Sequence, residues 1–127
     1  MASWFDDPCF DHEAETVGAF TLTGDAWRRL QSLRERGVAC SRVIAVAGVT
    51  FRKQEIQQAL REGVGTASLE AEPQNRYDEH AIKVCLGGKH VGYVPASMAA
   101  QMCASSVTPY VCSIAGGSTP HVWLVVV

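Results

Sequence analysis

The chain has 127 residues, 47% of them hydrophobic and 19% charged, which argues against wholesale disorder and fits one soluble globular domain. No stretch approaches the ~18 continuous apolar residues of a membrane span, and the N-terminus is acidic where a signal peptide would be basic, so we expect a cytoplasmic protein. The net charge of −2 divides unevenly. Residues 1–25 hold six acids and no lysine or arginine, whereas residues 26–127 hold eleven bases and seven acids.

The cysteines and histidines show no spacing typical of a metal or disulfide framework. The five cysteines form an odd number without a C-x-x-C pair, so we expect reduced and mostly buried thiols. The acids around His12 are interpreted as a solvated terminus rather than a metal site, and Cys40 has no nucleophile signature. Phosphate-loop, H-E-x-x-H and G-x-S-x-G motifs are missing from the sequence. We therefore expect no cofactor, no bound metal and no catalytic residue.

The first third of the chain is predicted to contain one helix. Residues 1–23 show no sustained period and are expected to form a loosely held arm, although Phe20 to Leu22 could be a short strand. Residues 25–36 follow a capping residue, place Trp27, Leu30 and Leu33 at helical spacing, and end before a glycine. We expect an amphipathic helix there, so that residues 1–38 form an acidic arm plus helix ahead of a domain at 39–127.

The remaining residues are predicted to be mainly β. Strands are expected at 41–48, 66–73, 81–86, 89–95, 108–117 and 118–127, with helices at 52–62 and 96–104. The Gly87-Gly88 pair is a hairpin signal. Five or six short strands joined by tight turns, with a helix between the first two, indicate a small OB/SH3-like β-barrel, closed or partly open, with two or three short helices.

Three blocks between Gly48 and Pro95 resemble the HIRAN domain family. The first strand ends in a glycine that is followed within a few residues by an aromatic. An E-P-x-N-x-Y-D-x-x-A-I-x-V block comes next, and a V-G-Y-V-P strand completes the pattern. The matching residues are Gly48 and Phe51; Glu72, Pro73, Asn75, Tyr77, Asp78, Ala81, Ile82 and Val84; and Val91, Gly92, Tyr93, Val94 and Pro95. The resemblance covers about residues 42–127 and implies a stand-alone HIRAN-type protein of the bacterial or phage kind.

The resemblance implies a non-catalytic module that captures the 3′ end of single-stranded DNA in DNA repair, replication or phage-related processing, beside a helicase or nuclease. Tyr77 would stack on the terminal base, since bases stack on aromatic faces, and Asp78 would accept a hydrogen bond from the terminal 3′-hydroxyl. Phe51 and Tyr93 would shape the pocket. The other DNA-binding candidates are Arg52, Asn75, Arg76 and Lys89. Binding to DNA rather than RNA is left open by the residues.

Structural interpretations compete with each of these assignments. Asn75 and Asp78 are common turn residues that bond their own backbone, and Tyr77 could cap the barrel core. Phe51 and Tyr93 could also be core, and each basic residue could be solvated. The DNA-binding helicase members carry two adjacent aromatics after the first strand, whereas Phe51 stands alone here, and the acidic arm could compete with DNA for a basic groove.

A protein-interaction module is the alternative function. Small barrels expose strand edges and grooves that accept peptides. The apolar run from Val122 to Val127 must be covered by the barrel or by a partner, because an open apolar edge invites association. A homodimer could form through this run or through the helix at 25–36.

Overall fold

Two three-stranded antiparallel sheets face each other across one hydrophobic core. The computed structural model describes residues 14–40, 42–64 and 66–126. Within these ranges the chain forms eight strands in three sheets, three α-helices and two short 3-10 turns. The elements are, in order, β1 (Ala14–Val17), β2 (Phe20–Thr23), α2 (Gly24–Glu35), β3 (Arg42–Ala45), η1 (Val49–Phe51), α3 (Lys53–Glu62), β4 (Ala67–Ala71), β5 (Ile82–Leu86), β6 (Lys89–Tyr93), α4 (Ala96–Ala99), η2 (Ala104–Ser106), β7 (Pro109–Ala115) and β8 (His121–Val126).

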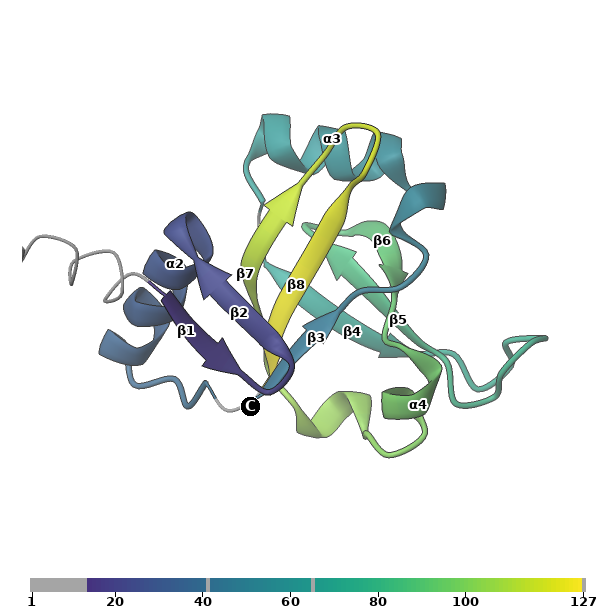
Figure 1. Cartoon of the computed structure of the whole chain (residues 1–127). Coiled ribbons are helices and arrows are strands. Elements are labelled where there is room, and N and C mark those ends of the chain that lie inside the picture. The colour runs from purple at the N-terminus through teal and green to yellow at the C-terminus, as the bar shows by residue number, and fades with distance from the viewer. Residues whose placement is uncertain (1–13, 41, 65, 127) are drawn as a thin grey trace, which may run out of the picture.

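The six strands after α2 form the two facing sheets, in the orders β3-β8-β7 and β4-β5-β6. Their inner faces meet in a core whose fully buried members include Ile44, Leu86 and Leu124. Helix α3 lies over one end of the two sheets and α4 lies at the other (Figure 1). The expected mainly β class is confirmed. The hydrogen-bonded ladders do not close into a barrel in the described residues, because β4 and β7 each keep one unpaired edge.

One bridge joins the two sheets in the part of the chain that is described. Strand β3 pairs with β8 up to Ala45, Val46 still donates its N–H to the carbonyl of Val122 in β8, and Ala47 then bonds to β6. Ala47 donates its N–H to the carbonyl of Tyr93 at 2.7 Å, and Tyr93 donates its N–H back to Ala47 at 2.9 Å. The end of the first core strand therefore lies directly against the V-G-Y strand.

The N-terminal hairpin corrects the expectation of a loose arm at residues 1–23. Residues 14–23 form β1 and β2, and residues 1–13, with the acidic cluster around His12, lie outside the described part. Val17 and Leu22 are buried in a second core with Leu30 and Leu33 of α2, which also includes residues of β3, β7 and β8. Glu15 of β1 pairs with Arg34 of α2. A hairpin this short is held by packing on the helix and sheet rather than by its own propensity.

Two other expectations from the sequence are resolved by packing. The helix expected at 96–104 ends at Ala99, and a separate 3-10 turn follows at Ala104–Ser106. Residues 122–126 of the apolar C-terminal run belong to β8, the middle strand of its sheet, with Val122, Leu124 and Val125 fully buried, and Val127 lies outside the described residues. The domain itself therefore covers this run. No helix in the described residues is long and apolar enough to cross a membrane.

Three of the four described cysteines, Cys40, Cys85 and Cys112, are free and buried, which agrees with the expectation of mostly buried thiols. Cys103 is free but exposed. Cys9 lies outside the described residues.

Candidate nucleic-acid interface

The loop between β4 and β5 is shaped by its own polar side chains. The Oδ1 atom of Asn75 accepts the N–H groups of Tyr77 at 2.9 Å and Asp78 at 3.1 Å. The Oδ1 atom of Asp78 in turn accepts the N–H of His80 at 2.8 Å. These are the local bonds by which Asn and Asp stabilise turns, so the predicted turn roles of both residues are confirmed. They also fix the direction of the chain at Tyr77.

Glu72 anchors this loop to strand β6. Its Oε1 atom accepts the side-chain N–H of Asn75 at 3.1 Å and the hydroxyl of Tyr93 at 2.9 Å. The hydrogen bond from Asn75 and, to a smaller extent, the one from Tyr93 lower the pKa of the Glu72 carboxyl. The carboxylate thus stays ionised at neutral pH. The position of the Tyr77 loop relative to Tyr93 is therefore set by a charge-assisted network.

The ring of Tyr77 stands in solvent. Its residue is 87% exposed, so the interpretation that Tyr77 caps the barrel core is wrong. The guanidinium carbon of Arg76 lies 5.6 Å from the centre of the ring, within the range of a cation–π contact. An exposed aromatic face with a cation beside it is a surface that can take a stacked base next to a phosphate.

A pocket of about 550 Å³ opens beside this ring. It is bounded by the loop on one side and by β6 and the residues after it on the other. Five of the predicted DNA-binding residues lie on its walls, together with four small or apolar residues: Asn75, Arg76, Tyr77, Asp78 and Tyr93, with Ala47, Ala81, Val94 and Ala96. The pocket therefore has a mostly apolar interior and a polar, partly charged rim.

Gly92 allows the close crossing that forms the inner wall. A Cβ atom at this position would lie 2.4 Å from the carbonyl oxygen of Ala47 and 2.5 Å from the side chain of Val46. Only glycine lets β6 approach the end of β3 so closely. The bridge between Ala47 and Tyr93 follows from this approach, and it holds Tyr93 at the pocket.

Tyr93 is a half-buried wall residue rather than a core residue. Its ring meets His90 edge to face, with ring centres 4.9 Å apart. Burial, reinforced by the bond to Glu72, raises the pKa of the Tyr93 hydroxyl, so it remains a hydrogen-bond donor. Burial and, to a smaller extent, the charge of Arg52 lower the pKa of His90. The imidazole ring is therefore neutral at neutral pH.

The other three predicted site residues do not line the pocket. Phe51 lies in η1 and is 86% exposed, so the interpretation of Phe51 as core is wrong. Arg52 is half-buried, and its charge acts on His90 and Tyr93. Lys89 pairs with Glu62 of α3 at 2.8 Å. Its charge is therefore already partly balanced within the protein.

Sequence reasoning missed the role of Glu72 and the small residues of the pocket walls. Glu72 belongs to the E-P-x-N block, but its partner Tyr93 is 21 residues away, and no local pattern connects them. Ala47 lines the pocket because β6 passes close to it at Gly92. The Gly92-Tyr93 pair was the feature of the sequence that could have indicated this close approach.

The two facing sheets and the pocket beside Tyr77 define a small β-rich binding domain. A model of the HIRAN domain matches residues 40–119 of the 127-residue chain. The chain therefore belongs to the HIRAN domain family, and this membership indicates a DNA-binding module. The matched range begins after helix α2 and contains β3 to β7. No curated protein and no solved structure matches the chain.

Proposed function

We propose that this protein is a non-catalytic module that binds the 3′ ends of single-stranded DNA. The observation that carries the proposal is the pairing of the exposed Tyr77 ring with the neighbouring Asp78 carboxylate on the rim of one pocket. A terminal base would stack on Tyr77, which is worth roughly 1–3 kcal/mol per base. The apolar pocket beside the ring would receive the last sugar or base.

Asp78 supports a preference for a terminal hydroxyl. Its Oδ1 atom is engaged by the N–H of His80, and in the described residues no hydrogen bond is made by Oδ2. A carboxylate oxygen accepts a hydrogen bond from a sugar hydroxyl but repels a phosphate. The site would therefore accept a chain that ends in a 3′-hydroxyl and reject a 3′-phosphate. Arg76, on the same rim, would face the phosphate that precedes the terminal nucleotide.

The test is fluorescence anisotropy with oligonucleotides that differ only at the 3′ end. We expect the 3′-hydroxyl strand to bind about tenfold or more tightly than the 3′-phosphate strand, since a hydrogen bond to a charged group is exchanged for a repulsion. Equal affinity for the two strands would contradict the proposal. A 5′-phosphate on the same strand should leave the affinity unchanged.

Matched variants separate the two side chains. Tyr77→Ala should weaken binding about fivefold or more, whereas Tyr77→Phe keeps the stacking face and should bind nearly as well. Asp78→Asn should reduce the discrimination between the two ends. Glu79→Gln removes the same charge from the next residue, which does not line the pocket, and should leave the discrimination intact.

The proposed place of this module is beside an enzyme that acts on DNA ends. A helicase or nuclease would supply the chemistry in repair, replication or phage-related DNA processing, and the HIRAN module would hold the end. If the wild-type protein gives no gel shift with single-stranded DNA at low salt, the protein-interaction alternative replaces this proposal.

A further inference from the structure

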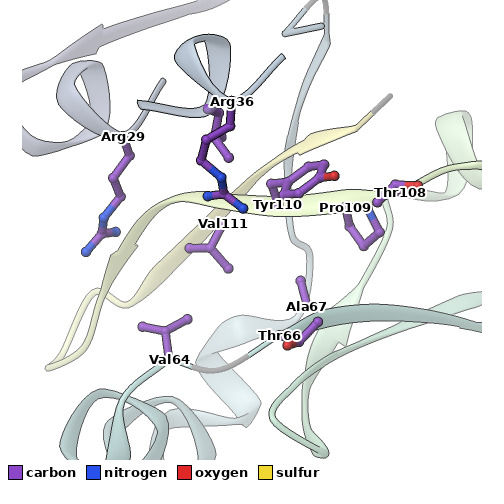
Figure 2. Close-up of a pocket in the computed structure, with 10 residues that line it drawn as sticks. Arg29, Arg36, Val64, Thr66, Ala67, Thr108, Pro109, Tyr110 and Val111 are labelled. Atoms are coloured by element: carbon purple, nitrogen blue, oxygen red, sulfur yellow. The ribbon is translucent and has the colours of Figure 1, made fainter. Parts of the chain in front are cut away.

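A second groove lies between the unpaired edges of β4 and β7. Its volume is about 430 Å³, and its walls come from α2, the start of β4 and the start of β7. Figure 2 shows Arg29 and Arg36 extending from the α2 side toward β7, with Val64, Thr66 and Ala67 across from them. None of these residues belongs to the 3′-end pocket.

The outer edge of β4 offers backbone hydrogen bonds to this groove. Gly87 donates to the carbonyl of Thr66, and Glu72 donates to the carbonyl of Ala81, so the even-numbered residues of this segment bond to β5. In an antiparallel ladder the residues between them direct their N–H and C=O groups away from the partner. Ala67 and Leu69 therefore point their backbone groups toward the side of β7. An unpaired edge of this kind is a template for an added strand.

The charge of the groove is entirely positive. Its lining residues include two arginines and no acid. Both arginines are exposed, and neither forms an ion pair with a carboxylate among the described residues. Arg34 on the same helix, by contrast, is paired with Glu15. The groove thus combines apolar walls, such as Leu33, Val64 and Val111, with two unbalanced cations.

We propose that this groove binds an extended acidic peptide segment of a partner protein. The peptide would add as a short strand along β4, with its backbone bonded to Ala67 and Leu69. Side chains of a strand alternate between two faces, so every second residue would be apolar against the groove walls and the intervening carboxylates would meet Arg29 and Arg36.

The same features disfavour two other occupants. A free strand edge pairs with a peptide backbone, and a nucleic acid has no such pattern of alternating donors and acceptors. A second copy that added its own β7 to this edge would bring Pro109 at the start of that strand, which lacks a backbone N–H to donate. An acidic peptide strand would form hydrogen bonds with the free backbone groups of β4 and would also balance the charges of both arginines.

The experiment uses the full-length protein and a fluorescein-labelled synthetic peptide, GDVDVDVG, in anisotropy titrations. The control peptide GDDDVVVG has the same composition without the alternation. We expect the alternating peptide to bind more tightly than the control. Arg29→Gln and Arg36→Gln should each weaken it about threefold and together about tenfold, as exposed pairs with carboxylates do. Arg42→Gln removes the same charge from an exposed position outside the groove and should have no effect.

Amide hydrogen exchange tests the added strand separately, because a purely electrostatic contact with the arginines would not protect backbone amides of β4. Peptide binding should slow exchange at Ala67 and Leu69 and leave Ser68 unchanged, because Ser68 already faces β5. The proposal is overturned if the alternating peptide does not bind at millimolar concentration, if it binds the double variant as well as the wild type, or if the exchange at Ala67 and Leu69 does not change. Loss of oligothymidine binding in the double variant would assign the groove to nucleic acid instead. Arginine-dependent dimerisation in size-exclusion chromatography would assign it to a second copy.

Discussion

Replacing Gly92 with alanine should break the connection between the two sheets. The added Cβ would lie 2.4 Å from the carbonyl oxygen of Ala47, whereas ordinary van der Waals contact begins at 3.4 Å. The obstacle is backbone, which cannot rotate away. The strand must therefore move, and the two hydrogen bonds between Ala47 and Tyr93 must lengthen or break.

The expected cost combines these effects. Overpacking typically costs about 1–3 kcal/mol, and each hydrogen bond contributes about 0.5–1.5 kcal/mol net. We expect Gly92→Ala to lower the free energy of unfolding by about 3 kcal/mol, a large part of the roughly 5–15 kcal/mol typical of a domain. For a chain of this length that corresponds to a melting temperature lower by about 10 °C.

Gly116→Ala provides the matched control. Its Cβ would also meet an atom at 2.6 Å, but that atom is the end of the exposed, flexible Gln57 side chain, which can move aside. Urea denaturation followed by circular dichroism gives both free energies. If Gly92→Ala costs no more than Gly116→Ala, the close crossing is not what holds the sheets together, and the reasoning fails.

Three further predictions concern the loop, the charges and the thiols. Asn75→Ala removes the acceptor of two backbone hydrogen bonds, so it should lower the free energy of unfolding, measured by urea denaturation, by about 1–2 kcal/mol. Tyr77→Ala removes an exposed ring and should lower it by less than about 0.5 kcal/mol. Equal losses for the two variants would contradict the role of Asn75 in the turn. In salt titrations of single-strand binding, Arg76→Gln should reduce the steepness of log K against log salt by about 0.7, for the one phosphate that Arg76 would contact. Tyr77→Ala should lower the affinity without changing this slope. An unchanged slope for Arg76→Gln would contradict a phosphate contact at Arg76. Hydrogen bonds from Ser105 and Ser106 lower the pKa of Cys103 to about 7, and burial raises the pKa of Cys112 to about 11. Iodoacetamide should therefore modify Cys103 before Cys112, with a rate that rises through pH 7, and mass spectrometry showing Cys112 modified before Cys103 would contradict this.

Much of the fold could be predicted because the local signals agreed with the final packing. The helix expected at 52–62 is α3, and the Gly87-Gly88 turn joins β5 to β6. The hairpin at residues 14–23 was indicated by the sequence only at Phe20 to Leu22, which fall in β2, whereas β1 had no signal of its own. Its strands have four residues each, which is too few for a clear period. Its stability comes from contacts with α2 and with Trp123, whose ring centre lies 5.1 Å from the ring centre of Phe20.

The candidate site was partly visible in the sequence for a different reason. Asn75, Tyr77 and Asp78 lie within four residues, so one loop brings them together without any long-range contact. The roles of Glu72 and Ala47 depend on a crossing with β6, and long-range pairing of this kind leaves no local pattern. Lys89 illustrates the converse case. A lysine two residues before the V-G-Y-V-P motif looks available from the sequence, but the structure pairs it with Glu62, 27 residues away.

The single bridge between Ala47 and Tyr93 has a consequence for how ligand binding and unfolding are related. Ala47 is the one pocket-lining residue from the β3 side of this seam, and the others belong to the β4–β5 loop, to β6 or to the residues after β6. A sub-global opening that parts the two sheets would therefore remove Ala47 from the wall and release Tyr93 from its bridge, while each sheet keeps its own ladder. Mild denaturant should then weaken binding before secondary structure is lost, and a ligand that contacts both Ala47 and the β4–β5 loop would hold the two sheets together.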